Sequence, residues 1–124
     1  MKIDREIKFR AWDKKLKSMI YDVAVGFGFC GIQAENNCSY FESKHDNDLL
    51  PLQFAGLKDK SGFEIYEGDI YHKGEKGINY VVVWHDTGLI GKQINSRSNY
   101  SGLEHWKNKI EVIGNIYENP DLLI

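Results

Sequence analysis

The segment INYVVVWH, from Ile78 to His85, limits the fold of this chain more than any other stretch of its sequence. β-Branched and aromatic residues at this density are typical of a strand covered by neighbouring structure, so we expect a central strand here. Glycine-containing turns flank it at Lys73–Gly77 and Asp86–Gly88. Several shorter strands with glycine turns between them complete the pattern, which favours a small barrel or sandwich over βαβ units.

Alternating residues predict a β-hairpin in the first part of the chain. Apolar and polar residues alternate from Ile7, a polar segment follows at Asp13–Ser18, and a second apolar run covers Met19–Val25. The next segment, up to Leu50, holds glycines, asparagines and charges without a clear period. We expect this segment to be irregular.

Ordered structure is expected again from Gln53. Turns built by Gly62 and Gly68 follow a short strand, and a last strand covers Ile110–Tyr117 with a bulge or bend at Gly114. The motif NPDLLI predicts a C-terminal helical turn that Asn119 caps and Pro120 begins.

The predicted fold is therefore mainly β. The stretch GDIYHKGEKGINYVVVW is similar to the opening hairpin of an SH3-like barrel. We expect a small SH3-like barrel with a short C-terminal helical turn in residues 52–124, preceded by the N-terminal β-hairpin and irregular segment in residues 1–51. One compact domain overall is the alternative, since 124 residues is an ordinary size for a single domain.

Charge is distributed unevenly along the chain. Sixteen basic and eighteen acidic residues give a formal net charge of −2, so no global field draws the protein onto nucleic acid or anionic lipid. The first twenty residues nevertheless hold seven Lys or Arg and three Asp or Glu. Basic residues interleaved with aromatic ones are typical of single-strand binding, although a solvated hairpin face explains the lysines as well. The candidate nucleic-acid or partner surface consists of Lys8, Arg10, Trp12, Lys14, Lys15 and Lys17.

Motifs for chemistry are weak throughout the sequence. Cys30 and Cys38 match neither a CxxC motif nor a zinc spacing, and the four histidines are scattered. The glycine-rich pieces lack the spacing of a dinucleotide fingerprint or a P-loop. We therefore expect no catalytic residues, no metal and no cofactor, and we expect the protein not to be an enzyme. The charged beginning MKIDREIKFR and the lack of a long apolar run predict a cytoplasmic protein with no membrane partner.

Three blocks of the sequence resemble the signature blocks of the YopX family of phage and prophage proteins. They are IKFRAWDKKLKSMI at Ile7–Ile20, LQFAGLKDKSGFEIYEGDI at Leu52–Ile70 and IEVIGNIYENPDLL at Ile110–Leu123. The resemblance implies a mostly β, phage-encoded protein of uncharacterised function, with no catalytic residues to carry over. The matching motif residues, most of them structural on physical grounds, include Gly56, Leu57, Asp59, Gly62, Ile65, Tyr66, Gly68, Asp69, Gly114, Asn115, Tyr117, Asn119 and Pro120.

Three functions from different classes remain, and the last in order is an enzyme whose paired carboxylates and histidines are assembled by the fold. The first is a non-enzymatic phage or prophage accessory protein that acts through protein contacts, as a homo-oligomer and with an unknown host or phage protein. The second is a nucleic-acid-binding module that uses the basic, aromatic hairpin.

Overall fold

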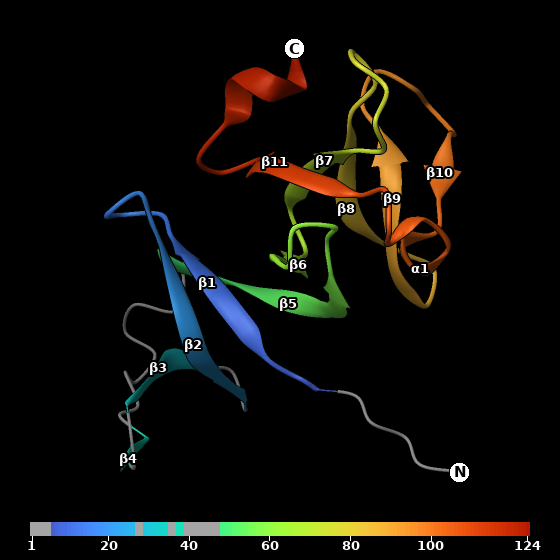
Figure 1. Cartoon of the computed structure of the whole chain (residues 1–124). Helices are drawn as coiled ribbons and strands as arrows, with labels where there is room; N and C mark the ends of the chain where they lie inside the picture. The colour runs from blue at the N-terminus through green and yellow to red at the C-terminus, as the bar shows by residue number, and fades with distance from the viewer. Residues whose placement is uncertain (1–5, 27–28, 35–36, 39–47) are drawn as a thin grey trace, which may run out of the picture. The chain divides into compact units, whose positions relative to one another are not determined.

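A computed structural model gives the structure of the chain, and it describes residues 6–26, 29–34, 37–38 and 48–124 (Figure 1). The fold is mainly β, with antiparallel pairing throughout the described strands, which confirms the predicted class. Two compact units divide the chain, Met1–Phe54 and Ala55–Ile124. That residues 1–51 and 52–124 fold as separate domains stays a prediction.

The first unit is built on the predicted hairpin. Strand β1 (Phe9–Asp13) pairs with β2 (Ser18–Gly26) on one edge and with the beginning of β5 (Leu49–Lys58) on the other. A register shift between Phe9 and Arg10 marks a bulge in the β1–β2 ladder. Ala11 and Val23 are buried together between these strands, with Phe9, Ile20 and Leu49 packed against them.

The segment predicted to be irregular contains strands in the part that the structure describes. β3 (Phe29–Ala34) pairs with β2, and the two-residue β4 (Asn37–Cys38) pairs with β3. The expectation of an irregular segment is therefore corrected here, since ladder hydrogen bonds to β2 hold residues whose own sequence has no strand period. The remainder of that segment, 27–28, 35–36 and 39–47, lies outside the described residues.

The second unit is a curled half-barrel (Figure 1). The end of β5 neighbours β6 (Glu64–Tyr66), and a five-stranded sheet has the order β10–β9–β8–β7–β11. The other members of this sheet are β7 (Asp69–His72), β8 (Tyr80–His85), β9 (Gly88–Gln93), β10 (Tyr100–Ser101) and β11 (Glu111–Asn115). β8 is the middle strand, which confirms the position predicted from its sequence. The SH3-like detail stays a prediction.

The second unit also contains a short helix that the sequence does not announce. α1 (Leu103–Trp106) lies in the stretch between the strand predicted at Ile78–His85 and the one predicted at Ile110–Tyr117. Leu103 is buried, and Trp106 packs against the same cluster, so one face of this single turn joins the core. The rest of that core consists of Ile65, Tyr71, Tyr80, Val82 and Ile110, with Ala55, Leu57, Ile78, Leu89 and Val112 packed around it.

The chain closes with the predicted helical turn, the 3₁₀ helix η2 (Pro120–Leu123). Pro120 is its first residue, as expected. The predicted cap is wrong in one respect, because the side chain of Asn119 makes no capping hydrogen bond to η2. That side chain instead accepts a hydrogen bond from the backbone of Asn115, at 3.1 Å.

Candidate functional site

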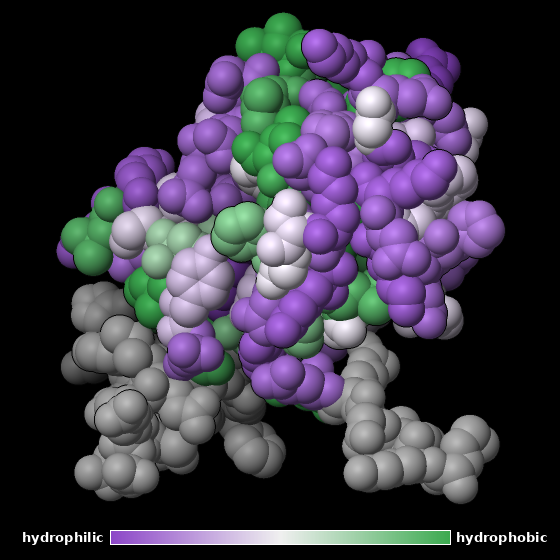
Figure 2. All heavy atoms as spheres, viewed as in Figure 1, coloured by the Kyte–Doolittle hydropathy of each residue, from purple (hydrophilic) through white to green (hydrophobic). Residues whose placement is uncertain are grey.

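The six residues of the predicted basic surface fall into two groups. Lys14, Lys15 and Lys17 are exposed on the turn between β1 and β2. The Asp13 carboxylate organises this turn, since its Oδ1 accepts hydrogen bonds from the backbone N–H groups of Lys15 and Leu16, each at 2.9 Å. Figure 2 shows hydrophobic surface beside hydrophilic surface at this turn, where Leu16 is exposed.

The other members of the set are turned toward the protein. Arg10 and Trp12 are 3% and 7% exposed, so neither offers a free face to a partner. The Arg10 guanidinium contacts Tyr21, whose hydroxyl lies 3.5 Å from Nη1. Lys8 is partly exposed, with its ammonium 4.7 Å from the Phe54 ring centroid. Alternation along the strand predicted that Lys8, Arg10 and Trp12 share one face, but not that this face would be covered as well as the opposite face that carries Ala11.

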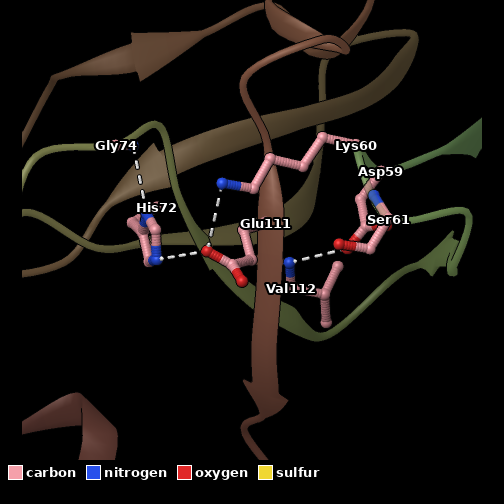
Figure 3. A network of polar contacts seen from close by, with 7 residues as sticks. All are labelled: Asp59, Lys60, Ser61, His72, Gly74, Glu111 and Val112. Atoms are coloured by element: carbon pink, nitrogen blue, oxygen red, sulfur yellow. Dashed lines mark hydrogen bonds and ion pairs between the residues drawn. The ribbon is translucent and has the colours of Figure 1, made fainter.

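The motif residue Asp59 fastens two distant segments of the second unit. It is buried at the β5–β6 turn, and its Oδ1 accepts from the backbone N–H groups of Ser61 and Phe63, each at 2.9 Å. Its Oδ2 accepts from the N–H of Val112 in β11, at 3.0 Å. Lys60 N donates to Ile110 O at 2.9 Å beside this contact. The carboxylate therefore occupies a backbone position at the edge of β11 where a further strand would otherwise bond (Figure 3).

Two further motif carboxamide and carboxylate groups hold turns. Asp69 is buried and its Oδ2 accepts from Tyr66 N at 2.8 Å, which closes the bend at Gly68. The Oδ1 of Asn115, also buried, accepts from the backbone N–H groups of Tyr117 and Glu118 at 3.1 and 2.8 Å. These side chains replace the backbone partners that a turn leaves unsatisfied.

Two motif glycines are required by close packing. Gly68 has φ +90°, and a Cβ there would lie 2.8 Å from Cε2 of Tyr117. A Cβ on Gly114 would lie 2.8 Å from Cγ of Asn119, next to the bulge between Val112 and Gly114 in β11. The predicted bulge is confirmed, and both glycines leave room for motif side chains.

The remaining motif residues have positions of the same structural kind. Ile65 and Tyr66 are buried, and Leu57 packs against the core. Gly56 and Gly62 have φ of +83° and +90°, a backbone conformation that favours glycine. The motif set therefore holds turns and core together in the second unit.

A polar network joins β7, β11 and the β5–β6 turn (Figure 3). His72 and Glu111 are directly opposite each other in the β7–β11 ladder, and His72 Nε2 lies 3.1 Å from Glu111 Oε2. Lys60 Nζ lies 3.4 Å from the same oxygen. The backbone N–H of Gly74 donates to His72 Nδ1 at 3.0 Å, so the neutral ring carries its proton on Nε2 and both nitrogens are engaged.

A pocket of about 260 Å³ lies elsewhere in the second unit, and it was not predicted from the sequence. Residues of the β7–β8 connection, of β8 and of α1 with the segment after it line the pocket; they are Lys73, Glu75, Ile78, Tyr80, Trp106 and Lys109. The wall is aromatic and two ammonium groups stand at it. Two stretches far apart in the sequence, 73–80 and 106–109, supply these residues, so no local spacing could have revealed the pocket.

His85 and Asp86 are brought together because the β8–β9 turn begins between them. His85 Nε2 lies 3.4 Å from Asp86 Oδ2, both groups are exposed, and the imidazole stacks on the Tyr100 ring at 4.1 Å between centroids. Among residues 6–26, 29–34, 37–38 and 48–124, no three His, Cys, Asp or Glu side chains gather as a metal ion would need. No helix in this part of the chain has the length and apolar character that crossing a membrane requires.

Comparison with known proteins found a family that matches the sequence and solved structures that are similar to the fold. The family model described as YopX protein matches residues 8–124. The structure is similar to protein EF1440 from Enterococcus faecalis, with a TM-score of 0.63 and 24% identity over 98% of this chain and 100% of that one. It is also similar to protein yopX from Bacillus subtilis, with a TM-score of 0.60 and 19% identity over 94% of this chain and 95% of that one. A comparison with curated proteins found no match.

Proposed function

The chain belongs to the YopX family, and from this premise we propose that it is a non-enzymatic phage or prophage accessory protein that acts through protein contacts as a homo-oligomer. It works in the cytoplasm of the bacterial host, where an unknown host or phage protein is its further partner. One observation carries the proposal, namely two exposed apolar side chains on the turn and the strand that the Asp59 carboxylate joins.

These side chains are Phe63 and Ile113. Phe63 is 66% exposed and Ile113 39% exposed, although both are large hydrophobic residues. The N–H of Phe63 and the N–H of Val112, the neighbour of Ile113, bind the two oxygens of the same carboxylate. Large apolar side chains that stay exposed on two joined segments favour an interface, because their burial against a partner is stabilising.

The scaffold under this patch is rigid, which suits a contact surface. Two hydrogen bonds to the Asp59 side chain fix the turn that carries Phe63, and Ile113 lies at the bulge in β11. A surface that is fixed before binding loses little conformational freedom when a partner covers it. Figure 2 shows more hydrophobic surface over the C-terminal helical turn, where Leu123 is exposed.

The histidine of the polar network has both ring nitrogens engaged, which favours contacts over chemistry. A histidine that acts as a general base needs a ring nitrogen whose lone pair can take a proton from a substrate. Within the described network, His72 uses Nε2 toward Glu111 and Nδ1 toward the Gly74 backbone.

Sedimentation equilibrium across a wide range of protein concentration tests the homo-oligomer. Replacing both patch residues, Phe63→Ser with Ile113→Ser, is expected to weaken self-association by about tenfold or more, as truncation of central apolar contacts does. Trp84→Ser is the matched control, because Trp84 is exposed on β8 outside the patch. A monomer at every concentration in the unaltered protein would contradict the proposal.

Capture of the tagged protein from a host lysate tests the further partner. We expect a bound protein that survives nuclease treatment and is lost with the Phe63→Ser, Ile113→Ser variant. Retention of the same protein by that variant would place the contact elsewhere.

Nucleic-acid binding through the β1–β2 turn is the second candidate. Three exposed lysines gathered on one turn favour it, and Leu16 among them offers an apolar contact. Charge reversal of Lys14, Lys15 and Lys17 to Glu is expected to abolish binding to a single-stranded oligonucleotide. The binding constant of the unaltered protein should fall steeply with salt. Lys58→Glu, at an exposed position in the second unit that does not line the pocket, is the control. Equal binding by the two variants would remove this surface from consideration.

A further inference from the structure

The aromatic pocket of the second unit has a cation built into its wall. The Lys73 ammonium lies 4.2 Å from the centroid of the Trp106 ring and 4.5 Å from the centroid of the Tyr80 ring. It also donates a hydrogen bond to Ser101 Oγ at 3.0 Å. An ammonium group has three donors, so two are left for a bound ligand. The side chain is thus held in position before any ligand arrives.

The wall behind this cation is firmly supported. Tyr80 is buried and its ring stacks on that of Tyr71, with centroids 5.3 Å apart and planes at 16°. Trp106 packs against the core through α1. A ligand in the pocket would therefore meet a fixed aromatic surface instead of mobile side chains.

A second ammonium group stands near the same indole. Lys109 Nζ lies 6.0 Å from the Trp106 ring centroid, and Lys109 is exposed. Glu75 adds one negative charge among the lining residues, so two positive charges and one negative charge surround the opening. This balance favours an anionic ligand.

We propose that this pocket binds one nucleotide, with its phosphate between Lys73 and Lys109 and its base against Trp106 and Ile78. Lysine ammonium groups are common phosphate ligands, and an aromatic wall accepts the planar face of any base. Glu75 lines the same pocket, and a carboxylate there would accept a hydrogen bond from an exocyclic amino group of the base. The volume of about 260 Å³ suits one nucleotide and is small for a dinucleotide cofactor.

A phosphate and a base of this kind could come from either of two ligands, a free mononucleotide or a nucleotide within a single strand. The site is independent of the apolar patch around Phe63 and of the lysines on the β1–β2 turn. Its existence goes beyond the proposed assembly and does not require it.

Titration calorimetry on the full chain tests the site, with AMP, a short single-stranded oligonucleotide and inorganic phosphate as separate probes. We expect AMP or the oligonucleotide to bind, and Lys109→Gln to weaken that binding by about tenfold, since a charge-assisted contact is lost. Lys107→Gln is the matched control, because Lys107 is exposed at the end of α1 but does not line the pocket. Trp106→Leu should weaken binding of both nucleotide probes.

The outcomes separate the two sources and the alternatives. Binding of AMP with no gain for the oligonucleotide identifies a free nucleotide, and much tighter binding of the oligonucleotide identifies a strand. Inorganic phosphate that binds as tightly as AMP would overturn the proposal, because the base would then contribute nothing. Equal losses in Lys107→Gln and Lys109→Gln, or no binding of any probe, would overturn it too. Lys109 is exposed, so unchanged thermal unfolding of its variant is expected to confirm an intact fold.

Discussion

Two aspartates at turns between strands, Asp13 in the first unit and Asp59 in the second, both bind backbone N–H groups. They differ in how far along the sequence their hydrogen-bond partners lie. Each is buried, and each uses Oδ1 to accept two backbone N–H groups of its own turn. Asp13 makes these bonds to residues two and three positions later. Asp59 Oδ2 also accepts a hydrogen bond from the backbone N–H of Val112, which lies 53 positions later in the sequence.

The difference shows how one residue type can build either a local turn or a tertiary joint. A carboxylate has two oxygens and about four acceptor sites, so satisfying a turn leaves capacity for a distant donor. In the first unit the ladders of β1 with β2 and β5 need no such joint. In the second unit β11 is an edge strand, and Asp59 satisfies one of its outward N–H groups.

Asp59→Ala is expected to have the largest effect on this comparison. It removes the acceptor of three backbone donors at once, one of them in another strand, and should lower the free energy of unfolding by about 3 kcal/mol. Urea unfolding measures the loss. Hydrogen exchange should also show faster exchange at the amide of Val112.

Asp59→Asn is the control for this prediction. It keeps the shape of the side chain and one acceptor oxygen but turns the other into a donor, so an intermediate loss is expected. An Asp59→Ala variant with unchanged exchange at Val112 would show that the joint does not hold β11.

Gly91→Ala should have the second largest effect on stability, because Gly91 packs closely against Tyr71 in the second unit. A Cβ there would meet the Tyr71 hydroxyl and lie 2.8 Å from Cζ of that ring. Overpacking of this kind costs about 2 kcal/mol. Combining it with Tyr71→Phe should restore part of the loss, which a double-mutant cycle in urea measures. Strict additivity of the two changes would contradict the contact.

Tyr71→Phe also has an effect of its own. The Tyr71 hydroxyl is buried without a hydrogen-bond partner among the described residues, and burial, with Tyr80 second, raises its pKa above the usual range. The native state keeps this hydroxyl neutral while the unfolded chain ionises it near pH 10, so stability falls as the pH rises above about 10. Unfolding at alkaline pH should therefore show a shallower fall in Tyr71→Phe, and an unchanged profile would count against the burial of this hydroxyl.

Asp13→Ala tests the local member of the pair. The two donors it leaves belong to an exposed turn where water can replace the carboxylate, so we expect a loss of about 1 kcal/mol in urea unfolding. A loss as large as that of Asp59→Ala would break the distinction between a local and a long-range role.

Lys60→Ala should change stability least. Its ammonium pairs with Glu111 at 3.4 Å, but both side chains are more than 40% exposed, and such pairs contribute about 0.3 kcal/mol. The Lys60 backbone N–H to Ile110 is retained in the variant. Urea unfolding at low and high salt measures the effect, and a loss above 1 kcal/mol would show that the network in Figure 3 is stronger than a surface pair.

Sequence reasoning succeeded where a single segment carries its own signal. The density of β-branched residues in Ile78–His85 and the glycine in the β11 segment predicted the central strand and the bulge. It failed where the signal is shared between segments. β3 was not predicted because its residues lack a clear period and its pairing with β2 decides its structure. Asn119 was predicted to cap the last helical turn, but its side chain accepts a hydrogen bond from the backbone N–H of Asn115 instead. The pocket around Trp106 likewise needs two stretches that are far apart in the sequence, so it was not predicted.

The bond between Asp59 and Val112 has a consequence for synthesis on the ribosome. The turn that contains Asp59 emerges from the ribosome well before β11 does. Until β11 is synthesised, Asp59 Oδ2 lacks the N–H of Val112 and the edge of β7 that pairs with β11 stays open. Contacts of such sequence separation form late and slow folding, and an open edge invites pairing with other chains. Nascent chains that stall before Val112 should thus engage chaperones more than chains that have passed it.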